Sequence, residues 1–590
     1  MTIFVAAYII VGYTTFIRFL KAVYNKQPFD ENLLMTIASI GAFAIGEAPE
    51  GIALLLFYQV GTLFEDYAVD RSRRSISSLT NLLPESVNVL KEGEAVETEP
   101  EDVRIGDLVL IRPGERIPLD GVVVEGSSMI DTSSITGESV PRKVSEGGTV
   151  LSGCISLNGV LTVRVTSEYS DSTASRIISM IEDAYEAKSK SENFVTKFAR
   201  YYTPAVVLSA LLLATLPPLI LNAPFEDWLY RALTFLVISC PCALVISIPL
   251  AFFGGIGGAS RLGILVKGGN YLDALAVVDT VVFDKTGTLT EGTFGVERMI
   301  ANDIGEEELL EIAAHAEFHS NHPIAVSIRE AYGNDIDASM VGQTEEIAGK
   351  GMSAEINGHK VLVGNETLLS EAGVAFESVE GFGTAVYVSV DGAYKGCLMI
   401  SDRIRHDSAS AVAMLKDAGI KHIAMLTGDT GAAGEHVAAS LGIDTVHTNL
   451  LPGDKIGIVE GLLSEGRSVA FVGDGINDAP SLARSDVGIA MGAMGSDAAI
   501  EAADVVIMDD MPSKVPAAIM IAKRTRLISI ENIVFAIGIK VLFLALGALG
   551  YITLVEAVFA DVGVAVIAIL NSIRTLSTSK LMSRLKALES

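Results

Sequence analysis

Seven strongly apolar runs, separated by two long polar inserts, dominate the sequence. A helix of about 17 to 25 apolar residues crosses a bilayer, because hydrocarbon offers the backbone no hydrogen-bond partner outside the helix. The second and third runs are short, and the tight turn GEAPEG joins them. We therefore expect a bundle of about seven membrane-spanning helices. The runs are residues 3–19, 33–46, 51–64, 204–221, 232–253, 530–551 and 554–573.

The composition supports a hybrid of membrane spans and soluble domains. Half of the 590 residues are hydrophobic (50%), whereas 19% are charged, which is too many for a chain wholly inside a membrane. A chain of this length folds into several domains. The net charge of -29 argues against nucleic acid as a partner, because phosphate binding needs a basic face. An acidic surface favours cations or serves solubility.

Basic residues next to the apolar runs predict the orientation in the membrane. Cytoplasmic loops carry an excess of Lys and Arg. Both polar inserts and the C-terminus are therefore expected in the cytoplasm, and seven spans then leave the N-terminus outside. The first apolar run lacks a small-residue cleavage site and is interpreted as a span rather than a signal peptide. The basic residues are Arg71, Arg73, Arg74, Lys197, Arg200, Arg261, Lys267, Lys523, Arg524, Arg526 and those from Arg574 to Lys586.

The two inserts differ in character. Residues 75–190 contain short alternating runs rich in Val, Thr and Gly, as in DLVLIRPGERIPLDGVVVEG, which predicts a β-rich domain. Residues 268–520 alternate apolar strands with helical stretches, which predicts a parallel α/β sheet.

The segment VISCPCALVIS places Cys240, Pro241 and Cys242 inside an apolar run. Proline removes a backbone donor and breaks or kinks the helix, and lipid tolerates such a defect only where protein or a cavity satisfies the freed carbonyls. The segment therefore predicts a polar site at mid-membrane depth, or else a kinked helix with two cysteines acting as small hydrophobes. With four cysteines and one close pair, no disulfide framework is implied.

Several predicted strands of the second insert end in polar groups that suit phosphoryl transfer. The strand before DKTGTLT ends in Asp284, and a carboxylate there can attack a phosphoryl group. Other strand ends offer carboxylates for Mg²⁺ and a hydroxyl and an ammonium for phosphate oxygens. A single Asp-Gly strand end is a weak signal, but four in one domain predict one catalytic centre. The further residues are Thr427, Gly428, Asp429, Lys455, Asp474, Asn477 and Asp478.

With these motifs together, the chain resembles the P-type ATPases. Because Cys-Pro-Cys stands in a span before DKTGT, it resembles the heavy-metal-transporting branch of that family. DKTGTLT, TGD, GDGINDAP, TGES and NHP stand in the family's order over nearly the whole chain. The resemblance implies a multi-domain membrane protein: an α-helical transmembrane bundle of about seven spans, a β-rich actuator domain, and an α/β haloacid-dehalogenase-like phosphorylation domain carrying an inserted α+β nucleotide-binding domain. The implied boundaries are 1–74 for the first three spans, 75–190 for the actuator, 191–266 for the next two spans, 267–292 and 400–522 for the phosphorylation domain, 293–399 for the nucleotide-binding domain, and 523–590 for the last two spans and the tail.

The resemblance also implies roles for individual residues. In SSITGES, Glu138 orients the water that hydrolyses the aspartyl phosphate; taken alone, it would be a solvated turn residue. Lys285, Thr286, Thr427, Asp429 and Lys455 join Asp284 in catalysis. Mg²⁺ is bound by Asp284, Thr286, Asp474 and Asp478. ATP is bound by Glu317, His322, Glu346, Gly349, Gly351, Gly364 and Asn365, which individually are commonplace loop and surface residues.

Two thiolates and two intramembrane charges predict the transported ion. Cys240 and Cys242 suit soft or borderline metals. Lys540 and Asp561 lie within apolar runs, where ionisable groups mark a transport path or pair with each other, although snorkelling is the alternative. A site made of two thiolates, one carboxylate and one ammonium has no net charge when it holds a divalent ion, which favours M²⁺ over Cu⁺. The family's zinc, cadmium and lead branch is similar in having this Lys and an Asp-x-Gly, here Asp561 and Gly563.

Three features bear on how the ion enters and leaves. Glu65 is either a ligand that helps to release the ion or an interfacial carboxylate. Related pumps have eight spans, so the first family helix is expected to be absent or to lie upstream of Met1. The family's N-terminal metal-binding domain has no counterpart here, so ion delivery is expected directly from the cytoplasm or from a soluble metal carrier.

The sequence thus predicts an ATP-driven exporter of Zn²⁺, Cd²⁺ and Pb²⁺ that works through an aspartyl phosphate, with ATP and Mg²⁺ as cofactors. A copper(I) exporter and a membrane-anchored phosphohydrolase are the alternatives. We expect a monomer surrounded by membrane lipid, without nucleic acid, in the plasma membrane if the chain is prokaryotic.

Overall fold

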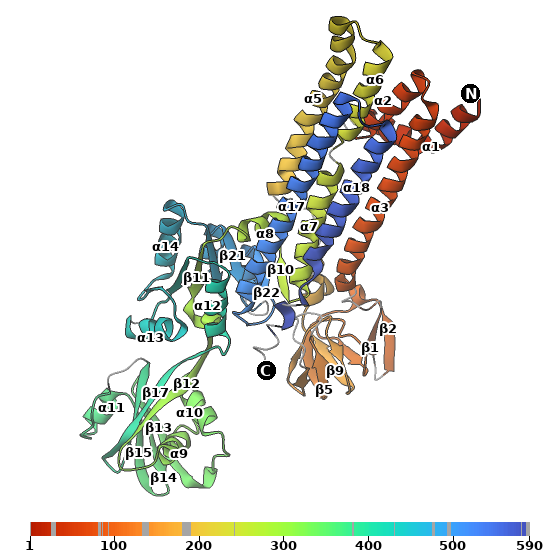
Figure 1. The fold of residues 1–590 in the computed structure, drawn as a ribbon. Coiled ribbons are helices and arrows are strands. Elements are labelled where there is room, and N and C mark those ends of the chain that lie inside the picture. The colour runs from red at the N-terminus through yellow and green to blue at the C-terminus, as the bar shows by residue number, and fades with distance from the viewer. Residues whose placement is uncertain are drawn as a thin grey trace. The chain divides into compact units, whose positions relative to one another are not determined.

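The computed structural model describes the chain apart from residues 1, 25–30, 81–83, 85, 92–93, 133–140, 177, 180–189, 241, 348, 380–382, 430, 475–477, 493–496, 580, 584 and 586–590. The chain separates into two compact units (Figure 1). The first contains Met1–Val277 and Ala517–Ala587, and the second contains Val278–Pro516.

Helices form at every apolar run of the sequence. Among the described residues, five helical stretches are long and apolar enough to cross a membrane, and a shorter apolar helix covers Asn32–Ala44. Small and aliphatic residues from these helices, such as Leu34, Leu54, Val206, Leu233 and Leu554, form their shared core. The helices are α1 (Thr2–Tyr24), α2 (Glu31–Ala44), α3 (Ala48–Thr80), α5 (Lys190–Leu221), α6 (Phe225–Ile238), α7 (Cys242–Ser260), α17 (Lys514–Leu549) and α18 (Leu554–Ile573).

The run 232–253 is one apolar segment but two helices. α6 ends at Ile238, and α7 begins at Cys242. Pro241 lacks the N–H that would continue the helical ladder, so the break is the expected consequence of its position. The first unit also contains strand β10 (Ile264–Val266) and helix α8 (Gly269–Leu275).

The first polar insert is β-rich, as its alternating pattern predicts. One sheet has the strand order β2-β1-β3-β9-β4-β7, and a smaller one has the order β6-β5-β8. β9 buries alternate residues, Leu161, Val163 and Val165, against the core. The strands are β1 (Val87–Lys91), β2 (Glu94–Thr98), β3 (Leu108–Ile111), β4 (Gly121–Gly126), β5 (Ser128–Asp131), β6 (Arg142–Val144), β7 (Thr149–Val150), β8 (Ile155–Ser156) and β9 (Leu161–Val165).

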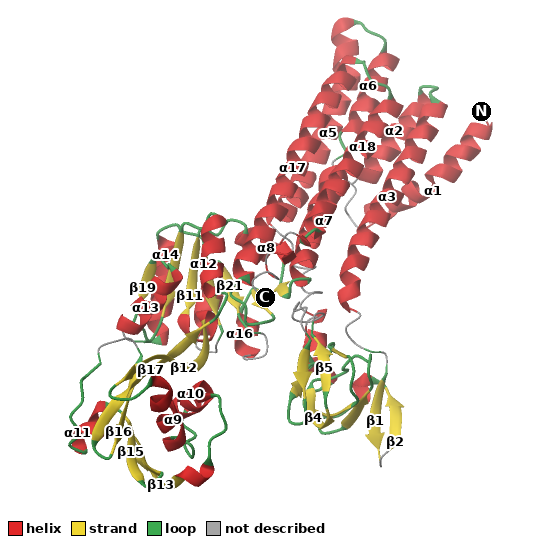
Figure 2. Cartoon of the chain, turned by 60° about the horizontal axis from the view of Figure 1, so that its bottom comes forward, coloured by secondary structure: helices red, strands yellow, loops and turns green. Residues whose placement is uncertain are grey.

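The second unit is built on a parallel sheet flanked by helices (Figure 2). Its strands run in the order β22-β21-β20-β11-β18-β19, and every described pairing among them is parallel. The strands are β11 (Thr280–Asp284), β18 (His422–Leu426), β19 (Thr445–His447), β20 (Val469–Gly473), β21 (Val487–Ala490) and β22 (Val505–Ile507). The helices are α12 (Ser408–Asp417), α13 (Gly431–Leu441), α14 (Pro452–Ser464), α15 (Ala479–Arg484) and α16 (Asp497–Ala502).

An antiparallel sheet is inserted into this unit, with the order β12-β17-β16-β15-β14-β13. β15 sends Val361 and Val363 into a core with α9 and α10, and Leu362 into a separate core with α11, so helices cover both faces of the sheet. The two longest strands, β12 (Thr290–Ala301) and β17 (Ala393–Ile404), lead out of and back to the parallel sheet. The remaining elements are α9 (Glu306–Ala316), α10 (Pro323–Tyr332), β13 (Val341–Ile347), β14 (Gly351–Ile356), β15 (His359–Gly364), α11 (Glu366–Glu371) and β16 (Thr384–Val390).

Candidate functional site

Asp284 ends the central buried strand of the parallel sheet. All five residues of β11 are buried, and parallel strands β18 and β20 flank it. Burial, and then the negative charge of Asp478, raise the pKa of Asp284 to about 7. Near neutral pH the carboxyl is therefore divided between its protonated and ionised forms until a cation joins it.

Lys455 places one positive charge beside Asp284 and Asp478. Its Nζ donates to Asp284 Oδ1 at 2.6 Å and to Asp478 Oδ1 at 2.8 Å. Burial alone would lower the pKa of Lys455, but the two carboxylates outweigh burial and raise it. Lys455 lies in the first turn of α14, where the LLPGDK motif places it opposite the end of β11.

Three carboxylates converge beside Lys455. Ligand atoms of Asp284, Asp474 and Asp478 all lie within 4.8 Å of one another. Burial, and then the charge of Asp478, raise the pKa of Asp474. Carboxylate oxygens at this spacing suit a hard divalent cation, so these residues fit Mg²⁺. Thr286 is exposed in the loop after Asp284, and its part in binding Mg²⁺ stays a prediction.

The DKTGT loop needs its glycine. Gly287 has a φ of +72°, and a Cβ there would lie 1.6 Å from Asp474 Oδ2. A side chain would therefore force away one of the carboxylates that fit the cation.

Residues that the sequence analysis did not single out hold this loop in place. Arg405 donates to the carbonyls of Thr290 at 3.1 Å and Gly287 at 3.2 Å. Lys285 pairs with Asp429, and its Nζ lies 3.5 Å from Asp402 Oδ2. Asp402 lies near the end of β17 and Arg405 directly follows that strand, so both lie where the chain returns to the parallel sheet. That strand belongs to the antiparallel insert, where the strand-end rule for open parallel sheets gives no expectation.

Thr427 and Asp429 follow the neighbouring strand β18. Because Leu426 pairs in register with Asp284, Thr427 lies one residue beyond the level of Asp284. Thr427 is 2% exposed, and its Oγ1 accepts the Asp429 backbone N–H at 3.1 Å. Glu138 lies outside the described residues.

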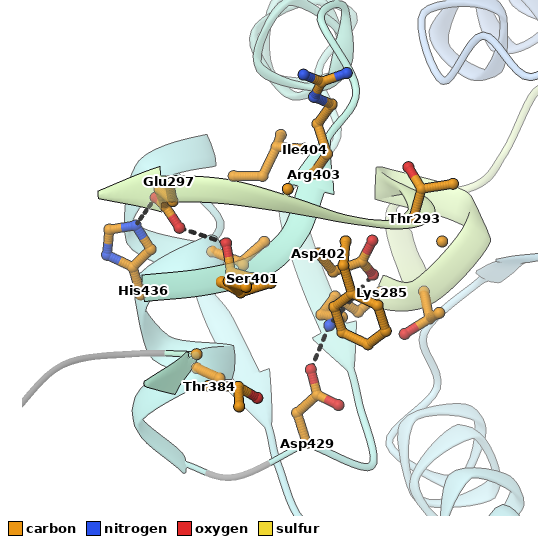
Figure 3. A pocket seen from close by; sticks show the side chains of 18 of the residues that line it. Lys285, Thr293, Glu297, Thr384, Ser401, Asp402, Arg403, Ile404, Asp429 and His436 are labelled. Atoms are coloured by element: carbon orange, nitrogen blue, oxygen red, sulfur yellow. Dashed lines mark hydrogen bonds and ion pairs between the residues drawn. The ribbon is translucent and has the colours of Figure 1, made fainter. Parts of the chain in front are cut away.

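A cavity of about 710 Å³ opens beside Lys285, between the two long strands and α13 (Figure 3). Glu297 accepts from Ser401 and lies 3.4 Å from His436 Nε2 at one end, while Asp402 and Asp429 lie near Lys285 at the other. A volume of roughly 300 to 1,000 Å³ is typical of small-molecule sites.

The predicted nucleotide residues do not line this cavity; they lie on the inserted sheet and between α9 and α10. One group gathers at the β14–β15 pair: Gly351 faces Gly364 in register, and Asn365 Nδ2 donates to the Gly349 carbonyl at 3.0 Å. A Cβ on Gly364 would lie 2.2 Å from the Lys350 carbonyl, so the close approach of these strands requires glycine.

The second group lies at the start of α10. His322 caps this helix by accepting the Ile324 N–H at 3.3 Å. Glu317 is buried, and burial raises the pKa of its carboxyl to about 7, with the charge of Glu346 among the contributing causes. A buried, protonated carboxyl can donate a hydrogen bond to a ligand, which suits recognition of a purine ring nitrogen.

The membrane helices bring Lys540 and Asp561 together. Lys540 on α17 bonds to Asp561 on α18, to the Cys240 carbonyl, and to the Ile238 carbonyl at 3.2 Å. Lys540 and Asp561 are 7% and 8% exposed, so the two charges pair with each other and do not snorkel to an interface. The carbonyls freed at the break between α6 and α7 thus find a donor.

The cysteines are only partly described. Cys240 is fully buried. Pro241 and the side chains of Cys242 and Glu65 lie outside the described residues.

The chain belongs to the P-type ATPases. The model of the P-type ATPase actuator domain matches residues 81–182, and the model of haloacid dehalogenase-like hydrolases matches residues 278–486. Within this family the chain belongs to the heavy-metal-transporting branch. It is 53% identical over 579 residues to a cadmium, zinc and cobalt-transporting ATPase of Bacillus subtilis, covering 97% of this chain and 82% of the relative.

Two further proteins support this assignment. A zinc-transporting ATPase of Synechocystis is 51% identical, with 97% of this chain and 80% of the relative covered. The crystal structure of a zinc-transporting PIB-type ATPase in the E2.Pi state matches with a TM-score of 0.62 and 35% identity, over 97% of this chain and 95% of that one. The expected family, fold class and enzyme class are therefore confirmed. The chain is an integral membrane ATPase that uses ATP and Mg²⁺.

The raised pKa of Asp284 predicts that Mg²⁺ binding releases protons. Because the native pKa of about 7 lies above the ordinary value of 3.8, the carboxyl still holds a proton at pH 6.5. Mg²⁺ favours the ionised form and displaces that proton. Calorimetry at pH 6.5 in two buffers of different ionisation enthalpy should detect the release, and at pH 8 it should be largely absent.

Asp284→Asn provides the control for this measurement. It removes one titrating group while Asp474 and Asp478 remain, so proton release at pH 6.5 should fall. Equal release from both proteins would contradict the raised pKa of Asp284.

The buried pair in the membrane predicts non-additive effects on stability. Lys540→Met leaves Asp561 buried without a counter-charge and should destabilise the protein by about 3 to 5 kcal/mol. Lys540→Met combined with Asp561→Asn removes both charges and should lose less stability than the sum of the single variants. Thermal unfolding in one detergent and lipid mixture measures the unmodified protein, Lys540→Met, Asp561→Asn and the double variant. Additive losses would show that the two side chains do not act as a pair.

Proposed function

We propose that this chain exports divalent heavy-metal ions, Zn²⁺ and Cd²⁺ and by the same chemistry Pb²⁺, driven by ATP. The observation that carries the proposal is the contact of Lys540 with Asp561 and with two carbonyls at the helix break beside Cys240. The ion pair thus contacts the backbone at Cys240, in a helical bundle whose core includes Leu233, Val237 and Leu554. The names of the bacterial relatives support zinc and cadmium, and also include cobalt.

The charges at this point favour a divalent ion. Lys540 and Asp561 neutralise each other through their ion pair. Reduced Cys240 and Cys242 would then contribute two negative charges, which M²⁺ cancels and Cu⁺ does not. A buried uncompensated charge is costly, so the divalent ion is the better cargo. Thiolates also disfavour Ca²⁺ and Mg²⁺, which prefer oxygen ligands.

The phosphorylation site supports the aspartyl-phosphate chemistry of the family. Ionised Asp284 would attack the γ-phosphorus of ATP; the bond to the β–γ bridging oxygen breaks, and ADP leaves with that electron pair. Lys455, already bonded to Asp284, would stay beside the transferred phosphoryl oxygens. When bound by Asp284, Asp474 and Asp478, Mg²⁺ supplies charge neutralisation. Lys285, Thr286, Thr427 and Asp429 would position the phosphate, and Glu138 would orient the hydrolytic water.

We assign ATP binding to Glu317, His322, Glu346, Gly349, Gly351, Gly364 and Asn365. The glycines let a ligand approach the strand pair, and Glu317 offers a donor when protonated. The cavity beside Lys285 would then accommodate the phosphate end of the nucleotide. We also propose that the pump is a monomer in the plasma membrane and receives its ion from the cytoplasm or from a soluble carrier.

Two other functions have less support. A copper(I) exporter is disfavoured by the charge balance at Lys540 and Asp561. A membrane-anchored phosphohydrolase would use Asp284 but gives no reason for a charged pair beside Cys240 within the membrane helices.

The test is ATP hydrolysis by the purified protein in lipid, with a thiol reductant, as single metals are added. Zn²⁺, Cd²⁺ and Pb²⁺ should stimulate turnover, and Cys240→Ala and Asp561→Ala should abolish that stimulation. Asp284→Asn should form no acid-stable phosphoenzyme from labelled ATP and should still bind Zn²⁺. Stimulation by Cu⁺ alone would overturn the charge argument, and metal-independent hydrolysis of small phosphate esters would favour the phosphohydrolase.

A further inference from the structure

An amphipathic groove lies between α17 and α18, apart from the metal and phosphorylation sites. Its volume is about 450 Å³, within the range of small-molecule sites. Phe535, Ile567 and Leu570 form its apolar part. Their exposures of 37%, 53% and 60% leave this part open on the outer surface of the helices. A polar part adjoins it, made by Glu531, Asn571 and Arg574.

The order of these residues along the helices matches the depth profile of a membrane. α17 passes through Glu531 and then Phe535, and α18 passes through Ile567 and Leu570 before the chain reaches Arg574. The basic residues around Arg524 and Arg574 place these helix ends on the cytoplasmic side. The apolar part therefore lies toward the hydrocarbon, and the polar part lies at the headgroup level.

Hydrogen bonds close the groove at its cytoplasmic end. Asn571 Nδ2 donates to Glu531 Oε2 at 3.1 Å and to Asn532 Oδ1 at 2.9 Å. The exposed side chains of Phe535, Ile567 and Leu570 adjoin this end and offer an acyl chain an apolar surface.

The polar end carries one charge of each sign. Arg574 Nη1 lies 3.5 Å from Glu531 Oε2, and the two side chains remain 59% and 44% exposed. Arg574 Nη1 also donates to Asn571 Oδ1 at 2.5 Å. The guanidinium has five donors and the carboxylate has two oxygens, so both retain capacity for a ligand.

We propose that this groove binds one phosphatidylethanolamine molecule of the cytoplasmic leaflet. The lipid phosphate would accept from Arg574, and the ammonium would donate to Glu531, so the headgroup complements both charges. An anionic headgroup such as phosphatidylglycerol would meet Arg574 but repel Glu531. Phosphatidylcholine has the right charges but no N–H to donate.

The hydrogen bonds at the groove connect it to the helix after the break. Asn532 Nδ2 donates to Ser572 Oγ at 2.9 Å, and Ser572 Oγ donates to the Ser247 carbonyl on α7 at 2.7 Å. Lipid in the groove would therefore stabilise the packing of three helices at their cytoplasmic ends.

The experiment is native mass spectrometry of the full chain in detergent with an equimolar mixture of phosphatidylethanolamine, phosphatidylcholine and phosphatidylglycerol of matched acyl chains. The expected result is one retained lipid with roughly a tenfold preference for phosphatidylethanolamine, the size of one charge-assisted hydrogen bond. Glu531→Gln should abolish the preference over phosphatidylcholine and raise retention of phosphatidylglycerol. Arg574→Gln should reduce retention of all three lipids.

Two more variants keep the test specific. Arg526→Gln removes a charge at the same membrane level, from an arginine that lies 3.7 Å from Asp273 and not in the groove, and should leave the preference unchanged. Leu570→Trp fills the exposed apolar part without altering the polar end, and should lower retention of every lipid. The proposal is overturned if the unmodified protein retains the three lipids equally or prefers phosphatidylglycerol. It is also overturned if Arg526→Gln and Arg574→Gln have equal effects. A dimer of the unmodified protein that dissociates in Leu570→Trp would show that a second copy of the chain, and not lipid, occupies the groove.

Discussion

The arrangement of the membrane helices depends on one buried ammonium group. The helix breaks between Ile238 and Cys242, as a proline in the sequence there predicts, and the break frees carbonyls that lipid cannot satisfy. Lys540 meets two of them and pairs with Asp561, so one side chain joins α6, α17 and α18. Without Asp561 the ammonium would be a buried charge, and without Lys540 the carbonyls would lack a donor. The helix break, Lys540 and Asp561 therefore depend on one another.

The phosphorylation site uses the same principle with a different purpose. Lys455 bridges Asp284 and Asp478, but its single positive charge does not balance the three carboxylates of Asp284, Asp474 and Asp478. Burial, and then this surplus negative charge, raise the pKa of Asp284, and the three carboxylates together suit a divalent cation. In the membrane, Lys540 and Asp561 neutralise each other, so the positive charge of an arriving ion would have to be balanced by the cysteine thiolates. A bound cation would thus offset the surplus of the carboxylates in one proposed site and the thiolates in the other.

Sequence reasoning located the elements better than the contacts among them. Apolar runs predict helices because hydrocarbon leaves the backbone few alternatives, and Asp284, Thr427 and Asp474 are found because polar residues at the ends of buried strands are conspicuous. The carbonyl partners of Lys540 could not be predicted, since every residue has a carbonyl and only the helix break selects Ile238 and Cys240. Arg405 was missed for a similar reason: it reaches Gly287 and Thr290 from a strand distant in sequence.

The groove between α17 and α18 follows from how two charged sites share the same helices. Polar side chains join the helices at the level of Lys540 and again near Glu531. Side chains between these levels need not interlock, because lipid is as good a neighbour for Phe535 or Leu570 as another helix. An apolar surface open to lipid, with polar contacts at its cytoplasmic end, is the result. Ser572 also bonds to α7, so a shift of α7 would be transmitted to α18 beside this surface. Lipid bound there would therefore favour whichever state of the helix break keeps the groove open.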